Sequence, residues 1–269
     1  MTRMTHTMNE SDLLKVFITG ASSGLGRELA LAYAKQGAAL ALVARRGEEL
    51  ENLRKQLPYP ERHRCYSVDV TDHAALRVAA EDFLAHHGMV DVVIASAGVS
   101  VGTLTEIADD MAVFERVVQT NLMATVATFA PFIPVMKRHA AQRRCRLVGI
   151  ASVAGIRGLP GAGAYSASKA AVISYCESLR LELKPAGIAV VTIAPGYIDT
   201  PMTRVNHYRM PFLMPAADFA SKAVKAIQAG RSYLVIPWQM GWVAKLLRLL
   251  PNIVYDQLFL RAPRKARQK

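Results

Sequence analysis

Seven short apolar runs, separated by segments long enough for helices, constrain the fold of this chain more than any other feature of its sequence. The runs cover residues 15–20, 38–44, 63–70, 90–96, 145–152, 188–195 and 232–237. Most of them are near-continuous stretches of Val, Ile, Leu and Ala, as is typical of strands that are buried on both faces. Strands that alternate with helices form a parallel sheet covered on both sides. The sequence therefore predicts a three-layer α/β fold, a doubly wound Rossmann-type parallel sheet of about seven strands.

The alternating pattern predicts one domain over residues 14–237, with a different segment on either side. The chain has 269 residues, which is long for one domain, but α/β folds of this size are common. Residues 1–13 are polar and have no apolar signal-peptide region, so we expect a flexible N-terminus. Residues 238–269 form a helical, basic C-terminal extension. From residue 241 onward it carries seven Lys and Arg and one Asp, which is half of the chain's net charge of +12.

Several classes of protein are disfavoured by the sequence. Because the excess positive charge lies in the tail, and no nucleic-acid-binding motif is visible, we do not expect nucleic-acid binding. Residues 117–136 lack charge but include two prolines and several polar residues, so a buried helix is expected there and no membrane span. The three cysteines are widely spaced, which favours buried thiols in a reducing cytoplasm and predicts no metal site.

A glycine-rich segment, TGASSGLG at residues 19–26, follows the first predicted strand and opens a helix. Glycines at such a turn let backbone N–H groups and the helix N-terminus approach a pyrophosphate closely. An ordinary tight turn is the alternative, but the position inside the first β-α-β unit favours a dinucleotide. The candidate cofactor-binding residues in this segment are Gly20, Ser22, Ser23, Gly24, Leu25 and Gly26.

Arg45 and Arg46 follow the second predicted strand, where NAD-binding proteins usually carry an acid for the ribose 2′-hydroxyl. A guanidinium instead suits the 2′-phosphate of NADP, so we predict that Arg45 favours NADP(H), with NAD(H) as the other possibility. A solvated pair of arginines is the alternative reading. Asp69, after the third strand, is a candidate partner for the adenine amino group, although aspartate is also a common helix cap.

Tyr165 and Lys169 lie four residues apart in the segment GAYSASKAA, so a helix would place them on one face. A surface Tyr/Lys pair is the alternative. A positive charge beside a phenol makes its proton easier to lose, which suits a general acid/base. Ser152 stands thirteen residues before Tyr165 and lacks the flanking glycines of a hydrolase nucleophile, so it is expected to donate a hydrogen bond to a substrate carbonyl.

Together these segments resemble the short-chain dehydrogenase/reductase family over about residues 14–236. The glycine-rich segment, the serine thirteen residues before YSASK, Asn121 in an NL pair, and APGYIDTPM at residues 194–202 occur in the family's order. The resemblance implies that Tyr165 exchanges a proton with the substrate oxygen while hydride moves to or from the nicotinamide. It also implies that Lys169 bonds the nicotinamide ribose, that Ser152 polarises the carbonyl, and that Asn121 anchors a water chain from Lys169 to solvent.

The resemblance adds cofactor positions after the later strands. These are Val70, Ala97, Gly98, Pro195, Gly196, Ile198 and Thr200, besides Tyr165 and Lys169. One segment departs from the family pattern: Ala95-Ser96-Ala97-Gly98 stands where members carry two asparagines before Ala-Gly. The missing amide side chains usually brace adjacent strands, so weaker local bracing is expected here.

The predicted substrate is a hydrophobic ketone or aldehyde and its alcohol, because apolar residues surround the candidate polar groups. The candidate substrate-binding residues are Ser152, Val153, Tyr165 and Met202. The predicted activity is that of an NADP(H)-preferring carbonyl reductase or alcohol dehydrogenase. A non-catalytic dinucleotide sensor or scaffold on the same fold is the alternative.

The C-terminal extension contains an apolar stripe at helical spacing. Its members are Trp242, Val243, Leu246, Leu247 and Leu250, with Lys245 and Arg248 on another face. Such a stripe most often packs on its own protein, as a lid over the substrate cleft or at a subunit contact. An interfacial helix on an anionic membrane is the alternative. The resemblance further implies a homodimer or homotetramer, paired through helices near residues 111–137 and 164–184.

Overall fold

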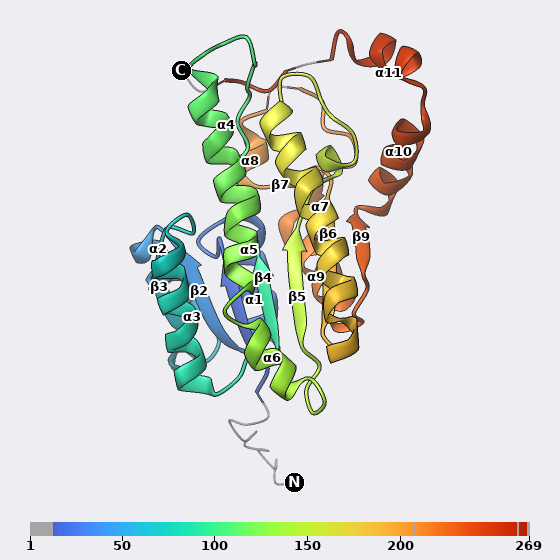
Figure 1. Cartoon of the computed structure of the whole chain (residues 1–269). Coiled ribbons are helices and arrows are strands. Elements are labelled where there is room, and N and C mark those ends of the chain that lie inside the picture. The colour runs from blue at the N-terminus through green and yellow to red at the C-terminus, as the bar shows by residue number, and fades with distance from the viewer. Residues whose placement is uncertain (1–12, 207, 263, 268–269) are drawn as a thin grey trace, which may run out of the picture.

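The central sheet contains all seven predicted strands, and every neighbouring pair runs parallel. The computed structural model describes residues 13–206, 208–262 and 264–267. The strands are β1 (Lys15–Thr19), β2 (Ala39–Ala44), β3 (Arg64–Ser67), β4 (Val92–Ala95), β5 (Arg146–Ile150), β6 (Ala189–Pro195) and β9 (Tyr233–Ile236). Their order is β3-β2-β1-β4-β5-β6-β9 (Figure 1), so the chain reverses its direction of travel across the sheet between β3 and β4. This order confirms the predicted doubly wound fold.

Helices cover both faces of the sheet and give the molecule three layers (Figure 1). On one face lie α1 (Gly24–Ala34), α2 (Gly47–Gln56) and α9 (Ala216–Gln228). On the other lie α3 (His73–His87), α4 (Asp110–Val118), α5 (Ala124–Phe129), α6 (Ile133–His139) and α7 (Gly163–Leu183). The connection after β1 passes over one face of the sheet and the connection after β4 passes over the other. Their divergence leaves a crevice at the carboxyl ends of β1 and β4, which is where such sheets bind ligands.

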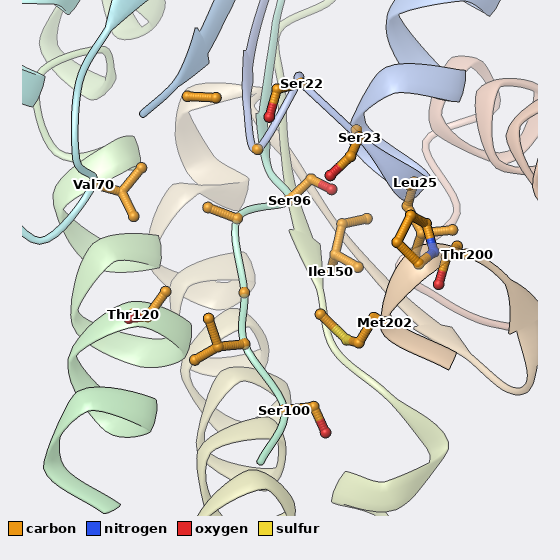
Figure 2. A pocket seen from close by; sticks show the side chains of 18 of the residues that line it. Ser22, Ser23, Leu25, Val70, Ser96, Ser100, Thr120, Ile150, Thr200 and Met202 are labelled. Atoms are coloured by element: carbon orange, nitrogen blue, oxygen red, sulfur yellow. The ribbon is translucent and has the colours of Figure 1, made fainter. Parts of the chain in front are cut away.

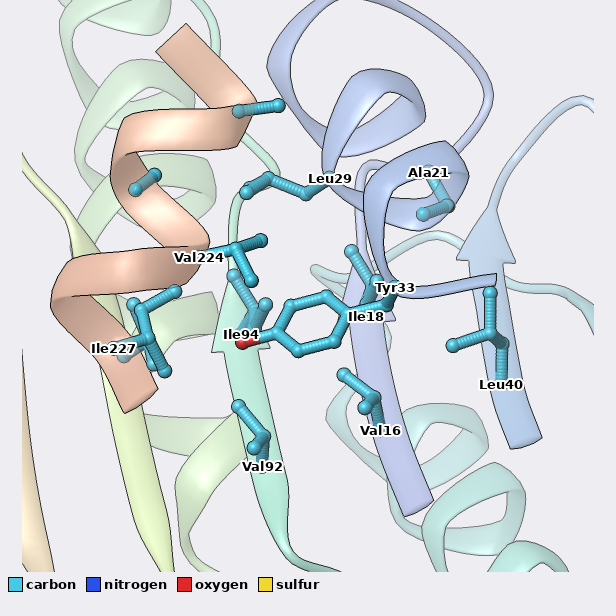
Figure 3. Close-up of a cluster of buried hydrophobic side chains, with 14 of the residues drawn as sticks. Val16, Ile18, Ala21, Leu29, Tyr33, Leu40, Val92, Ile94, Val224 and Ile227 are labelled. Atoms are coloured by element: carbon cyan, nitrogen blue, oxygen red, sulfur yellow. The ribbon is translucent and has the colours of Figure 1, made fainter. Parts of the chain in front are cut away.

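Each layer boundary holds its own apolar core. Tyr33 of α1 lies across Ile18 and Ile94 of the sheet and reaches toward Val224 of α9 (Figure 3). On the opposite face, the Phe17 ring packs against Phe132, with ring centroids 4.8 Å apart. Alternate side chains of β1 therefore point into opposite cores. This explains why Val16, Phe17 and Ile18 are all apolar.

The prediction of one buried helix over residues 117–136 is wrong, because the structure divides this region. α4 passes through a π-helical turn at Gln119–Met123 into α5, and α6 begins only at Ile133. Pro134 stands at the start of α6, where a missing backbone N–H costs least. A π-helical turn within an α-helix often accompanies a functional side chain. Here it carries Asn121.

Shorter elements follow β6 and complete the rim of the sheet. β7 (Ile198–Asp199) pairs with β8 (Met214–Pro215), and α8 (Pro201–Arg204) lies between them. Short 3-10 turns occur at Pro60–Arg62, Val153–Gly155 and Lys184–Ala186. The chain then forms α10 (Trp238–Leu249) and α11 (Asn252–Phe259), and residues 264–267 return toward α4 (Figure 1).

Three of the five residues in the apolar stripe of the C-terminal extension are exposed in this single chain, so the subunit contact and the membrane contact both stay predictions. The buried residues of α10 are Met240 and Ala244, whereas Trp242 is 68% exposed and Leu246 is 62% exposed. The helix therefore contacts the domain through a narrow face of small and flexible residues. It presents Trp242, Val243 and Leu246 to solvent, whereas Leu247 is half-buried. No helix in the described part of the chain is both long and apolar enough to cross a membrane.

Two of the three cysteines are buried, as the sequence predicts, and the third is only partly so. Cys145 and Cys176 are buried and Cys65 is half-buried, and all three are free thiols. Within residues 13–206, 208–262 and 264–267 there is no group of His, Cys, Asp and Glu suited to a metal ion.

Candidate active site

A cavity of about 670 Å³ opens at the carboxyl ends of the strands. Segments that follow β1, β2, β3, β4, β5 and β6 line it together with the start of α7, so residues far apart in sequence meet there. In Figure 2, Ser22 and Ser23 lie at one end of the cavity, and Ser100 lies at the other. Its length suits an extended ligand such as a dinucleotide with a substrate beside it.

The cavity brings together nearly every residue that the sequence singles out. Its walls include Gly20, Ser22, Ser23, Gly24, Leu25, Gly26, Arg45, Asp69, Val70, Ala97, Gly98, Ser152, Tyr165, Lys169, Pro195, Gly196, Ile198, Thr200 and Met202. Two predicted residues are not in the walls. Asn121 is fully buried behind them, and Val153 begins the 3-10 turn beyond Ser152, so its contact with substrate stays a prediction.

The glycine-rich turn is a cradle that side chains would fill. Gly20 has a φ of +71°, and a Cβ built on it would lie 2.8 Å from the Cα of Ala97. A Cβ on Gly26 would lie 2.2 Å from the carbonyl oxygen of Gly20. The first turn of α1 therefore sits directly against the end of β1, and its free N–H groups face the cavity. These residues fit the pyrophosphate of a dinucleotide.

Two arginines stand at the next wall of the cavity. The Nη2 atom of Arg46 donates a hydrogen bond to the hydroxyl of Ser22, at 3.0 Å, and its Nη1 atom lies 2.7 Å from Glu49. Arg45 is more exposed and lies 3.8 Å from a carboxylate oxygen of Asp69. Arg46 was not among the predicted cofactor residues, although it shares the dipeptide with Arg45 and its guanidinium reaches the glycine-rich turn.

Asp69 does not cap the following helix. Its Oδ1 atom accepts hydrogen bonds from the backbone N–H of Thr71, at 3.0 Å, and from the Thr71 hydroxyl, at 2.8 Å. Burial opposes ionisation of this carboxyl, but these hydrogen bonds and Arg45 hold the pKa of Asp69 below its ordinary value. Asp72 caps α3 instead, by accepting from the backbone N–H of Ala75. The Oδ2 atom of Asp69 is thus left facing Arg45 and the cavity.

Tyr165, Lys169 and Ser152 form a polar cluster in the wall of the cavity. The Nζ atom of Lys169 lies 5.9 Å from the centroid of the Tyr165 ring and donates to the carbonyl oxygen of Ile150, at 2.8 Å. Burial lowers the pKa of Lys169 to about 8, because the ammonium has lost most of its water. Burial raises the pKa of Tyr165, and a hydrogen bond with Ser152 opposes that rise. The phenol is therefore protonated at neutral pH in the unliganded protein, with a donor and a cation beside it.

Asn121 joins the segment after β4 to α7 from behind the cavity. Its Oδ1 atom accepts from the backbone N–H of Val99, at 2.8 Å, and its Nδ2 atom donates to the carbonyl oxygen of Val99 and to the hydroxyl of Ser168. Since Ser168 precedes Lys169, this contact helps to position the part of α7 that carries Lys169. The side chain is held by protein groups on both its polar atoms.

The bracing expected to be weak at Ala95-Ser96-Ala97-Gly98 is supplied by a residue of the neighbouring strand. The Thr19 hydroxyl donates to the carbonyl oxygen of Ile94, at 3.4 Å, and lies within hydrogen-bond distance of the backbone N–H groups of Ser96 and Ala97. One hydroxyl therefore ties the ends of β1 and β4 together.

Sequence reasoning missed other residues of the walls. They include Val99, Ser100, Val101, Arg116, Thr120 and Ile150. Val99, Ser100 and Val101 lie in irregular backbone after β4, and Arg116 and Thr120 lie on α4 and the π-helical turn that follows it. No local sequence pattern shows that these side chains face a cavity. Ile150 was visible as part of a predicted strand and faces the cavity because β5 ends there.

Comparison with known proteins identifies this architecture. The family model described as short chain dehydrogenase matches residues 15–209. The chain belongs to the short-chain dehydrogenase/reductase (SDR) family. As an SDR protein, it is an NAD(P)-dependent oxidoreductase, and the glycine cradle described above fits the nicotinamide dinucleotide that such enzymes use.

Three relatives of this SDR protein illustrate the range of the family. An uncharacterized oxidoreductase of Myxococcus xanthus is 36% identical over 252 residues, which cover 93% of this chain and 97% of that protein. A dehydrogenase of Sphingomonas, named 2-dehydro-3-deoxy-L-rhamnonate dehydrogenase (NAD(+)), is 35% identical over 185 residues, covering 69% of this chain and 72% of the enzyme. The structure of a 3-ketoacyl-(acyl-carrier-protein) reductase from Brucella melitensis, complexed with NADH, superposes with a TM-score of 0.76 and 26% identity over 83% of this chain and 96% of that one.

Proposed function

We propose that this SDR protein is an NADP(H)-preferring oxidoreductase that interconverts a hydrophobic ketone or aldehyde with its alcohol. The observation that carries the proposal is the polar cluster of Ser152, Tyr165 and Lys169 inside the cavity that also contains the glycine cradle. The remaining substrate-side wall includes Val101, Ile150 and Met202, which favour an apolar substrate.

The polar cluster divides the chemistry among its members. A bound nicotinamide supplies or accepts the hydride. In the direction of reduction, Ser152 donates a hydrogen bond to the carbonyl oxygen, and Tyr165 delivers its proton to that oxygen as the alcohol forms. In the direction of oxidation, Tyr165 accepts the proton of the alcohol. The Lys169 ammonium stabilises the phenolate left by reduction, and Asn121 belongs to the route that returns a proton to this side of the cavity.

The alternative of a non-catalytic dinucleotide sensor explains less of the structure. A sensor requires the glycine cradle but has no use for a tyrosine hydroxyl bonded to a serine beside a buried ammonium. Burying the Lys169 charge costs free energy, and the acid/base mechanism gives that charge a role that a sensor does not.

The preference for NADPH over NADH is expected to depend on Arg45. We expect NADPH to bind about tenfold more tightly than NADH, or ~1.4 kcal/mol, because the guanidinium pairs with the 2′-phosphate. Titration of the wild-type protein and the Arg45→Ala variant with each nucleotide, followed by nicotinamide fluorescence, measures this margin. Arg46→Ala is expected to weaken the binding of both nucleotides, since Arg46 also donates a hydrogen bond to Ser22 of the glycine-rich turn.

The matched control is Arg77→Ala, which removes an exposed charge on α3 away from the cavity. It should leave the ratio of the two affinities unchanged. Equal affinities for NADPH and NADH in the wild-type protein would contradict the assignment of Arg45 to the 2′-phosphate.

The proposed assembly is the one that the resemblance to the SDR family implies. We propose a cytoplasmic homodimer or homotetramer that pairs through α4 and α7, whose outward faces carry the exposed residues Met111 and Leu181. These residues are 62% and 59% exposed, which is unusual for large apolar side chains unless a partner covers them.

The exposed side of α10 and α11 suits contact with an anionic membrane surface. Apolar side chains gather there, namely Trp238, Trp242, Val243, Leu246, Leu249, Ile253, Val254, Leu258 and Leu260. The same region carries Lys245 and Arg248, and the segment from residue 241 has a net charge of +6. An apolar helix face beside a basic one matches the acyl boundary and the headgroups of an anionic bilayer.

Binding to vesicles tests this contact. Trp242→Glu is expected to weaken binding to phosphatidylserine-containing vesicles by about 30-fold or more, because it removes roughly 2 kcal/mol of apolar burial and adds a repelled charge. Val78→Glu, an equally exposed apolar position on α3, should have no such effect. Absence of binding by the wild-type protein, or equal binding by both variants, would exclude the membrane contact.

A further inference from the structure

The last described residues, 264–267, lie across the rim of the cavity. The carbonyl oxygen of Ala266 accepts from the backbone N–H of Gly102, at 3.0 Å, and Arg267 forms a parallel bridge with Gly102. The Arg267 guanidinium bonds both carboxylate oxygens of Asp110, at 2.8 and 3.0 Å. Asp110 is only 4% exposed, so this paired contact fixes the tail against the segment that follows β4.

The path that leads to this tail is anchored to the loop after Ser152. Arg157 of that loop donates to the carbonyl oxygens of Leu247 and Leu250, at 2.6 and 2.8 Å, and thereby caps the end of α10. Its guanidinium lies 3.9 Å from the centroid of the Tyr255 ring, and the Tyr255 hydroxyl donates to the carbonyl oxygen of Gly158. The extension is thus tied to the substrate side of the cavity at two separate places.

Between these anchors, Lys265 directs its ammonium toward the catalytic cluster. Its Nζ atom donates to the hydroxyl of Ser100, at 2.8 Å, and Ser100 is a residue of the cavity wall (Figure 2). The same atom lies 5.9 Å from the centroid of the Tyr165 ring, which equals the distance from Lys169. One small molecule that has its carbonyl at Tyr165 can therefore also reach Lys265.

Nothing among the described residues neutralises this charge. Lys265 makes no ion pair with a described carboxylate, because the nearby Asp110 is engaged on both oxygens by Arg267. The side chain is half-buried, and burial lowers the pKa of Lys265. A half-buried ammonium that has a single hydroxyl as its partner is stabilised when an anion arrives.

We propose that Lys265, together with Ser100, binds a carboxylate of the substrate, so that this enzyme prefers hydrophobic oxo acids or the matching hydroxy acids over neutral carbonyl compounds. The inference rests on the proposed function, since it places the carboxylate beside the carbonyl that Tyr165 protonates. A carboxylate fits better than a phosphate, because one ammonium and one hydroxyl balance one negative charge. The residue comes from the tail, outside the part of the chain that matches the family model.

Binding of a carboxylate and its ester to the NADPH-loaded protein tests the proposal without requiring turnover. Phenylacetate and methyl phenylacetate share an apolar body and differ in charge, and calorimetry measures the affinity of each. We expect phenylacetate to bind about tenfold more tightly to the wild-type protein, and Lys265→Met to bring the two affinities together. Lys265→Arg keeps the charge and should keep the preference for phenylacetate. Lys222→Met, an exposed position on α9, is the matched control for loss of one positive charge.

Three results would overturn the proposal: equal affinities in the wild-type protein, a preference that survives Lys265→Met, or binding of neither compound. A tail that serves only as packing would show the second result, because Lys265→Met keeps the aliphatic stem in place. Failure of the proposed function would be seen separately, as a protein that neither binds NADPH nor reduces neutral hydrophobic ketones.

Discussion

Replacing Tyr165 by phenylalanine is expected to lower the rate of carbonyl reduction by roughly 10²–10⁴-fold, the usual contribution of a positioned general acid. The variant keeps the ring that packs at the start of α7 but removes the hydroxyl that bonds Ser152. NADPH binding should be retained, because the glycine cradle and the arginines are untouched. Steady-state reduction of a panel of hydrophobic ketones, combined with an NADPH titration, measures both properties on the same protein.

The control for this substitution is Tyr233→Phe, which removes a hydroxyl from an exposed tyrosine on β9 outside the cavity walls. It should leave the rate unchanged. If the Tyr165→Phe variant reduced ketones at the wild-type rate, the proton would have to come from another group, and the assignment of Tyr165 as the acid would be wrong.

Replacing Gly26 by alanine is expected to destabilise the protein and abolish dinucleotide binding. The new Cβ would lie 2.2 Å from the oxygen and 2.7 Å from the carbon of the Gly20 carbonyl. Both contacts are with backbone, so α1 must move away from β1. Overpacking of this kind costs about 1–3 kcal/mol, and in a domain of this size the melting temperature falls by roughly 2–4 °C per kcal/mol. Thermal unfolding and NADPH titration measure the two effects.

Gly163→Ala is the matched control, because a Cβ at that helix start meets no atom within 4 Å. It should bind NADPH normally and melt at or above the wild-type temperature, since alanine favours helix. A Gly26→Ala variant that binds NADPH as tightly as wild type would show that the close approach of α1 to β1 is not required for the cofactor.

The sheet could be predicted from sequence because its strands are buried on both faces. Residues 38–44 and 188–195 are almost wholly apolar, and a covered parallel sheet accounts for such runs separated by helices. Most of the cavity wall could be predicted for a related reason. Gly20, Arg45, Asp69 and Gly196 each follow a strand, and the carboxyl ends of parallel strands meet at one edge of the sheet.

Features that depend on contacts between distant segments could not be predicted. The apolar stripe around Trp242 looked like a packing face, but α10 is oriented by Arg157, a residue ninety positions before Leu247. Lys265 was one more charge in a basic tail until the Arg267–Asp110 contact placed it beside Ser100. Local periodicity carries no information about such partners.

Asn121 shows a different limit. The family pattern picked it out, but its spacing alone would have made it a polar residue in a buried helix. The structure places it in a π-helical turn behind the cavity, where both polar atoms of its side chain are engaged. The turn shifts the register of the helix, so the residue's direction could not follow from a regular helical repeat.

The most direct measurement follows deuterium from NADPH that carries it at both positions of the nicotinamide C4. The wild-type protein is incubated with a panel of hydrophobic ketones and aldehydes, with and without a carboxylate, and the alcohols are analysed by mass spectrometry. We expect deuterium on the carbinol carbon of at least one product, at a rate that falls with Tyr165→Phe. A protein that binds NADPH but transfers no deuterium, or transfers it equally well without the Tyr165 hydroxyl, would contradict the proposed function.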